Sequence, residues 1–169
     1  MQKCGLEIER KYVILMPDVE LIRTMEEYTV SDITQIYLVA RKGETHRIRS
    51  RRYPDRTVYT ETRKRRIDGI SCEEIEEEID EAWFLALSTH PATDSHPVIK
   101  TRHTFAYLGK TVEIDVYPQW QRSAVMEVEL SDREEKLALP PFISIVKEVT
   151  GDHKYSNSSM SKQFPLELV

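Results

Sequence analysis

A pentapeptide near the N-terminus, Glu-Ile-Glu-Arg-Lys at residues 7–11, places side chains that could do chemistry at alternate positions. In a β-strand, side chains point to opposite faces in turn, so Glu7, Glu9 and Lys11 would share one face. Ile8 would point the other way. Carboxylates bind hard divalent cations, and a lysine ammonium binds anions such as phosphate. A solvated sheet face explains the same three charges, so the pentapeptide alone does not distinguish a binding site from an ordinary surface.

The same alternation recurs along the chain. Charged side chains repeat as ExE, RxR, KxR and ExD, and in several segments the intervening positions are apolar, as at Val112, Ile114 and Val116. A sheet built from such segments has one charged and one apolar face. Helices need an apolar face to pack on, so we expect the charged face to line the inside of a closed sheet. The in-phase charged positions are Glu7, Glu9, Lys11, Arg47, Arg49, Lys64, Glu74, Glu76, Glu78, Lys100, Arg102, Glu113, Asp115, Glu127 and Glu129.

Period-two patterning predicts eight strands, which are joined in part by short turns and interrupted by a few helices. Helices are expected over residues 17–28 and 141–149, after Asp80 as an N-cap, and after a capping box of Ser131 and Glu134. The predicted fold class is α+β and mainly antiparallel β: an eight-stranded closed tunnel or barrel with a charged interior and helices packed outside, in one domain over residues 1–169. The expected strands are 6–15, 34–41, 45–51, 57–66, 72–79, 97–107, 110–117 and 123–130, with hairpin turns at 42–44, 53–55, 67–69 and 108–110.

Composition narrows the class of protein. The 169 residues are 40% hydrophobic and 31% charged, which is typical of a globular chain. The net charge of -5 combines 24 basic and 29 acidic side chains, so the charge balance does not indicate a basic surface that binds nucleic acid. Cys4 and Cys72 are too few for a disulfide scaffold. No apolar run has the ~20 residues that a membrane span needs, so we expect a cytoplasmic location.

Eight ordered motifs resemble those of a known family. They are EIERKYV, HRIRSR, TETRK, EEIEEEI, VIKTRH, VEIDVY, VMEVEL and EVTGDHKYSN, which together span residues 7 to 157. In this order they are similar to the CYTH, or triphosphate tunnel metalloenzyme, superfamily and to its bacterial triphosphatase branch. The resemblance implies an eight-stranded antiparallel tunnel that binds a triphosphate-containing small molecule with Mg²⁺ or Mn²⁺. It implies hydrolysis of inorganic, thiamine or nucleoside triphosphate, or, in one branch, formation of cyclic AMP.

The resemblance also divides the charged residues into groups. Glu7, Glu9, Glu127 and Glu129 are expected to hold the metal, since the family places the first and last strands near each other. Glu7, Glu9, Lys11, Glu76 and Asp115 are the expected catalytic residues, while Glu74 and Glu113 are supporting carboxylates. The expected ligands of the triphosphate are the basic side chains, because arginine forks match phosphate oxygens and lysine supplies a point charge: Lys11, Arg47, Arg49, Lys64, Lys100, Arg102 and Lys154.

Two alternatives stay open. The chain could be an adenylate cyclase of the class IV type, although its lead-in MQKCGL does not resemble the His- and aromatic-containing lead-in of that branch. It could also be a non-catalytic protein that binds a nucleotide or polyphosphate in the same tunnel. We expect no specific nucleic-acid partner and no membrane, and we leave room for a homodimer.

Overall fold

The structure is a computed structural model that describes residues 8–66 and 72–169. Antiparallel strands dominate it and the helices are few and short, so the predicted α+β class is confirmed. No helix within these residues is long and apolar enough to cross a membrane. In chain order the elements are β1 (Glu9–Leu15), α1 (Val19–Ile22), β2 (Thr29–Leu38), β3 (Glu44–Arg52), β4 (Thr57–Arg66), β5 (Cys72–Ile79), α2 (Glu81–Ser88), β6 (Val98–Tyr107), β7 (Lys110–Val116), β8 (Ser123–Glu129), β9 (Ile145–Glu148), the 3₁₀ turn η1 (His153–Tyr155) and α3 (Asn157–Lys162).

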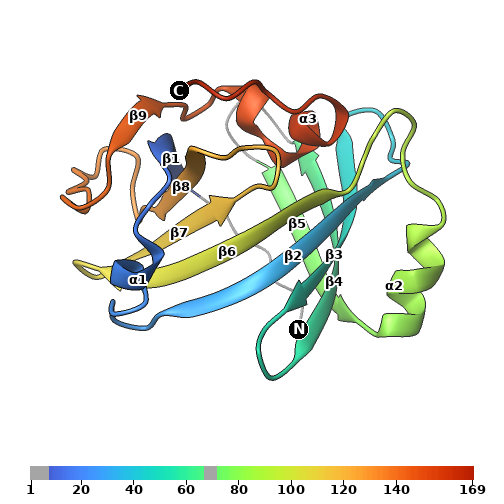
Figure 1. The fold of residues 1–169 in the computed structure, drawn as a ribbon. Coiled ribbons are helices and arrows are strands. Elements are labelled where there is room, and N and C mark those ends of the chain that lie inside the picture. The colour runs from blue at the N-terminus through green and yellow to red at the C-terminus, as the bar shows by residue number, and fades with distance from the viewer. Residues whose placement is uncertain (1–7, 67–71) are drawn as a thin grey trace. The chain divides into compact units, whose positions relative to one another are not determined.

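The described chain forms two compact units. In the first, which includes residues 32–99 and 157–164, the strand order is β5-β4-β3-β2. In the second, which includes residues 8–31, 100–156 and 165–169, the order is β6-β7-β8-β1-β9. Figure 1 shows the strands and helices of each unit. Closure of the strands into one tunnel and a single domain over the whole chain stay predictions.

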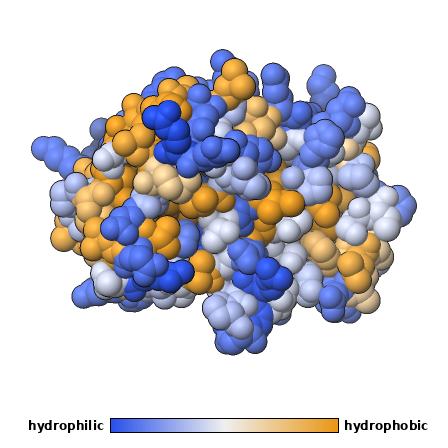
Figure 2. Space-filling view, in the orientation of Figure 1, coloured by the Kyte–Doolittle hydropathy of each residue, from blue (hydrophilic) through white to orange (hydrophobic). Residues whose placement is uncertain are grey.

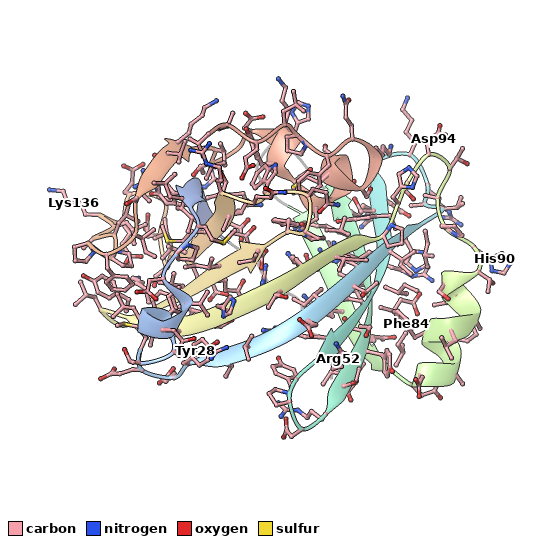
Figure 3. All side chains as sticks on the ribbon, in the orientation of Figure 1. Tyr28, Arg52, Phe84, His90, Asp94 and Lys136 are labelled. Carbon is pink, nitrogen blue, oxygen red and sulfur yellow. The ribbon has the colours of Figure 1, made fainter. Side chains whose placement is uncertain are left out.

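In the first unit, helix α2 covers the apolar face of the strands. Asp80 is its N-cap as predicted, and the Asp80 carboxylate accepts a hydrogen bond of 2.7 Å from the Trp83 backbone N–H. Phe84 lies on the side of α2 that faces β3 and β4 (Figure 3), where it packs with Leu38 and Ile48. Alternate residues of β3 and β4 therefore turn away from this core, and these include the predicted cations.

In the second unit, the apolar face of β1, β7 and β8 carries the larger core. Tyr12, Ile14, Ile114, Met126 and Val128 are buried there, at alternate positions of their strands. Helix α1 and the chain from 137 to 143 pack against the same face. The prediction that these strands have one apolar and one charged face is confirmed for this unit, since the intervening positions carry Glu9, Lys11, Glu113, Asp115, Glu127 and Glu129.

Two predicted helices are wrong. Residues 141–149 contain β9 instead, which pairs antiparallel with β1 through partners such as Tyr12 and Glu148. A ninth strand is thus present among the described residues, where eight were predicted. The expected capping box also fails, because residues 131–140 form turns and a loop and not a helix. The Ser131 backbone N–H donates to the Glu135 carboxylate at 2.8 Å within a loop.

The bounds of some other elements differ from the predicted ones by a few residues. The predicted helix over 17–28 contracts to α1, whose N-cap is Asp18, and β2 begins at Thr29 rather than at residue 34. Strands β4 and β5 have the predicted bounds, 57–66 and 72–79. The turn between β6 and β7 is also confirmed, since Leu108 and Gly109 both have positive φ, at 48° and 73°, as a tight hairpin turn requires. The predicted turn at 67–69 lies outside the described residues.

Apolar side chains also remain on the surface. Figure 2 shows hydrophobic residues interspersed with hydrophilic ones on the face in view. Val39, Leu108 and Leu166 are among the most exposed large apolar residues, at 71%, 70% and 88%. Exposed apolar residues scattered singly are normal for a folded chain and do not by themselves mark a binding surface.

Candidate active site

The second unit contains a buried ionic cluster centred on Asp115 of β7. Asp115 is 1% exposed and accepts hydrogen bonds from the Lys100 Nζ at 2.6 Å and the Arg102 Nε at 2.6 Å. A third bond joins the Arg102 Nη2 to the second Asp115 oxygen at 2.7 Å. Strand register explains the contact, since Arg102 on β6 lies opposite Asp115 on β7. One carboxylate therefore holds two buried cations.

Arg102 extends this cluster towards the N-terminal strand. Its guanidinium contacts Glu113 and lies 3.3 Å from a Glu127 oxygen, through Nη2. The other Glu127 oxygen is 2.7 Å from the Lys11 Nζ, and Lys11 is also 3.7 Å from a Glu9 oxygen. Carboxylates and cations thus alternate in a row that includes three of the predicted triphosphate ligands: Lys11, Lys100 and Arg102.

Burial and charge act in opposite directions on the pKa values of this cluster. Burial and the neighbouring Arg102 lower the pKa of Lys100 to about 8, against the opposing effect of Asp115. Burial alone would raise the pKa of Asp115, but Arg102 and Lys100 hold it well below its ordinary value. Burial would likewise lower the pKa of Lys11, yet Glu127 and Glu9 raise it above its ordinary value. Lys100 is therefore the cation that loses its charge most readily.

The first unit has a second charged face, on β3, β4 and β5. Arg49 lies 3.4 Å from Glu76, whose other oxygen accepts a 2.9 Å hydrogen bond from the Thr62 hydroxyl. Glu74 lies 3.2 Å from the Lys64 Nζ and 3.8 Å from Arg47. These five predicted site residues, Arg47, Arg49, Lys64, Glu74 and Glu76, are thus brought together on three adjacent strands. Thr62 was not predicted, because its neutral side chain breaks the charge alternation.

The remaining predicted site residues are Glu7, Glu129 and Lys154. Glu7 lies outside the described residues. Glu129 is exposed and lies directly across from Glu9 in the β1–β8 register. Lys154 is exposed on η1, where its backbone N–H donates to Asp152 at 3.2 Å. The structure does not bring the Lys154 side chain into either ionic cluster among the contacts of the described residues.

A small pocket opens beside the Lys11 end of the row. Its volume is about 200 Å³, and it is lined by Glu9, Lys11, His153, Ser156 and the backbone turn at 149–152. The Lys11 Nζ donates to the Tyr155 carbonyl oxygen at 3.4 Å on this side. Within residues 149–156 only Lys154 was predicted to be a site residue, because residues 141–149 were expected to form a helix. The two β-branched residues at the start of β9, Ile145 and Val146, are the signal that fits a strand.

Glu9 and Glu129 are the carboxylates best placed to hold a divalent metal. Both Glu127 oxygens contact cations, which leaves Glu9 and Glu129 as the more accessible pair of the predicted ligands. Like charges directly across two strands repel, and a divalent cation between them would relieve that repulsion. No cluster of three or more acidic, histidine or cysteine side chains able to hold a metal occurs in residues 8–66 and 72–169. The pair still fits Mg²⁺, which is commonly bound by one or two carboxylates together with substrate phosphates and water.

Neither a protein-family model nor a curated protein sequence matches the chain. Among solved structures, it is similar to the inorganic triphosphatase NE1496, with a TM-score of 0.63 and 27% identity over 96% of this chain and 98% of that one. It is also similar to PH1819 of Pyrococcus horikoshii, with a TM-score of 0.51 and 25% identity over 76% of this chain and 81% of that one.

A candidate adenylate cyclase from Bacillus halodurans shares the fold as well. The TM-score is 0.52, at 16% identity over 78% of this chain and 83% of that one, and this likeness concerns the fold alone. The ordered sequence motifs resemble those of the CYTH, or triphosphate tunnel metalloenzyme, superfamily, and the similarity of the whole chain to an inorganic triphosphatase agrees with that resemblance.

Proposed function

We propose that the protein is a divalent-metal-dependent triphosphatase that releases orthophosphate from a short linear triphosphate. The observation that carries this proposal is the row of ion pairs in the second unit, where Lys11, Lys100 and Arg102 are linked through shared carboxylates. A linear triphosphate bears several negative charges along its length, so a row of cations complements it better than a single cation does. The similarity to an inorganic triphosphatase supports the same substrate class.

The cations of the row are already paired, which affects how a polyanion binds. Arg102 contacts three carboxylates, Glu113, Asp115 and Glu127, so phosphate oxygens would compete with these partners for its N–H groups. Glu9 and Glu129 would hold Mg²⁺ or Mn²⁺, with Glu7 as a further ligand. When bound, the metal would neutralise charge on the phosphate oxygens and polarise the scissile bond. The positive charge of the metal would also attract the nearby carboxylates and so weaken their ion pairs with the lysine and arginine side chains.

The remaining roles follow from position. Lys11, Lys100 and Arg102 would bind and orient the phosphate chain, since charge-assisted bonds to phosphate are the strong ones. Asp115 would keep Lys100 and Arg102 in place between reaction cycles, and Glu113 would do the same for Arg102. We further propose that Arg47, Arg49 and Lys64, with Glu74 and Glu76, line the same closed tunnel, as the family resemblance implies. We also propose that Lys154 makes a secondary contact with the phosphate chain. The single domain, the cytoplasmic location and the homodimer remain proposals as well.

Product analysis tests the proposal directly. The purified chain is incubated with inorganic triphosphate or ATP, with Mg²⁺, with Mn²⁺ or with neither. Orthophosphate released only with metal supports the triphosphatase, whereas cyclic AMP from ATP would replace it with a cyclase. Binding of either compound without any product would leave a non-catalytic binding protein.

Two variants separate the cations from the carboxylates. Arg102→Ala should weaken metal-free binding of inorganic triphosphate, because it removes a charge-assisted partner worth about 1.5–3 kcal/mol. Glu9→Gln should keep most of that binding and lose metal-stimulated turnover. Arg52→Ala is the control, since Arg52 is a surface arginine whose side chain is 70% exposed. Equal loss of metal-free binding in the Arg102 and Glu9 variants would contradict the assignment of Glu9 to the metal.

A further inference from the structure

Residues 148–155 hold both the backbone and the side chain of Lys11. Strand β9 ends at Glu148, and the next residue still continues the ladder, since the Val149 N–H donates to the Lys11 carbonyl at 2.8 Å. The Lys11 N–H is then bonded by a side chain instead of a strand carbonyl: it donates to the Thr150 hydroxyl oxygen at 3.0 Å. Thr150 thus completes the pairing of Lys11 at the point where the chain leaves the sheet.

That hydroxyl is itself oriented by an ion pair. The Thr150 hydroxyl donates to a Glu148 oxygen at 2.9 Å, so its oxygen lone pairs are left to accept from Lys11. Glu148 is fixed in turn by two hydrogen bonds from the Arg10 guanidinium, at 2.9 and 2.8 Å. The Arg10–Glu148 pair is partly exposed and would add little by itself, but it holds the Glu148 oxygen nearer to the Thr150 hydroxyl than the alternative acceptor, the Lys11 carbonyl oxygen at 3.4 Å.

The chain then turns back over the Lys11 side chain. Gly151 has a φ of 74°, which favours glycine, and adding a Cβ there would meet no atom within 4 Å. After this turn the Asp152 N–H bonds to the Val149 carbonyl at 3.0 Å, and the Tyr155 N–H bonds to the Asp152 carbonyl at 3.0 Å. The Tyr155 carbonyl is thereby placed 3.4 Å from the Lys11 Nζ.

We propose that Thr150 is a positioning residue for Lys11: its hydroxyl anchors residues 149–155 so that the Lys11 ammonium is held between the Tyr155 carbonyl and Glu127. The ammonium then borders the pocket lined by Glu9, Lys11 and His153, where a phosphate group can contact it. Thr150 would not touch the substrate. This inference rests on the proposed function, because it assigns Thr150 a part in triphosphate binding through Lys11.

A double-mutant cycle on metal-free binding of inorganic triphosphate tests it by calorimetry. Thr150→Val keeps the shape of the side chain and removes the hydroxyl, which leaves the Lys11 N–H without this acceptor. We expect the dissociation constant to rise about five- to tenfold, the scale of one lost hydrogen bond. Thr150→Ser should restore the affinity. In a Lys11→Ala background, Thr150→Val should change the affinity by less than about twofold, because residues that act through each other are not additive.

The control is Thr111→Val, the same substitution at an exposed position of β7 opposite Ala106, and it should leave the affinity unchanged. Thr150→Ala removes the same hydroxyl without the added branch and provides the measurement if the valine variant folds poorly. A Thr150→Val effect that persists in the Lys11→Ala background would overturn the inference. So would wild-type affinity in Thr150→Val while Lys11→Ala binds weakly, a result that leaves the proposed function standing. If Lys11→Ala itself binds normally, the role of Lys11 in the proposed function fails first.

Discussion

Replacing Asp115 by Asn should destabilise the protein far more than the change of one atom implies. Both oxygens of the Asp115 carboxylate are in use: Oδ1 accepts from the Arg102 Nε, while Oδ2 accepts from the Lys100 Nζ and the Arg102 Nη2. An asparagine has only one acceptor oxygen. Whichever way its amide is turned, the NH₂ group must face a donor on Arg102 or Lys100.

The magnitude follows from burial. Lys100 and Arg102 are 3% and 8% exposed, so neither can recover its lost partner from water without moving. Removing one member of a buried ion pair typically costs about 3–5 kcal/mol of unfolding free energy. For a chain of this length each kcal/mol lowers the Tm by roughly 2–4 °C, so we expect a fall of roughly 6–20 °C.

The assay is thermal unfolding followed by circular dichroism, with urea unfolding as a check. Asp32→Asn is the matched control. It makes the same substitution in an ion pair with Arg52 at 2.9 Å, in which both side chains are more than half exposed. Such pairs contribute at most about 1 kcal/mol. If Asp115→Asn unfolds at the temperature of Asp32→Asn, Asp115 does not balance the charge of the two buried cations and its assigned role is wrong.

Two further outcomes are expected. Lys100 has a pKa of about 8 in the folded chain, against an ordinary 10.5. Between these pH values the unfolded chain therefore binds more protons at this site than the folded chain does. The contribution of Lys100 to the unfolding free energy consequently rises with pH in this range. Loss of the Lys100 charge should weaken metal-free triphosphate binding above pH 8, which calorimetry at pH 7 and 9 would measure. Lys100→Arg is the control, because the charge of an arginine does not titrate in this range. Equal pH dependence of binding in both proteins would contradict the prediction. Glu129→Gln should raise the unfolding free energy of the metal-free protein by a few tenths of a kcal/mol, because Glu9 lies directly across the strands, while lowering Mg²⁺-dependent turnover. A less stable Glu129 variant with unchanged turnover would argue against a shared metal site.

The two faces of each strand could be predicted from the sequence, because side chains alternate between the faces whichever strand lies beside it. Ile114 and Met126 are apolar at positions that alternate with Asp115 and Glu127, and burial of one face fixes the direction of both. The register could not be predicted in this way. That Asp115 lies opposite Arg102, and Glu127 opposite Lys11, depends on turn lengths and cross-strand pairing that sequence patterning does not encode.

The segment from 141 to 149 shows where patterning misled. Phe142, Ile145, Val146 and Val149 recur at the i, i+3, i+4 and i+7 spacing of an amphipathic helix, and the flanking Pro141 and Gly151 resemble helix boundaries. Pairing with the free edge of β1 decided in favour of β9, and β-branched residues suit a strand. The error concealed Thr150 and Tyr155, whose contacts with Lys11 exist only because the chain leaves β9 after Glu148.

The acidic strand β5 has a consequence for assembly. Among residues 8–66 and 72–169, it is the last strand in the order of the first unit and pairs with β4 along one side. An open strand edge can pair with the same edge of another molecule, which is a common route to aggregation. Two copies of β5 placed edge to edge would bring their carboxylates together, and the repulsion between them would disfavour that pairing. Glu77 and Glu78 are the exposed carboxylates of β5, while Glu73, Glu74 and Glu76 form ion pairs with basic residues of β3 and β4.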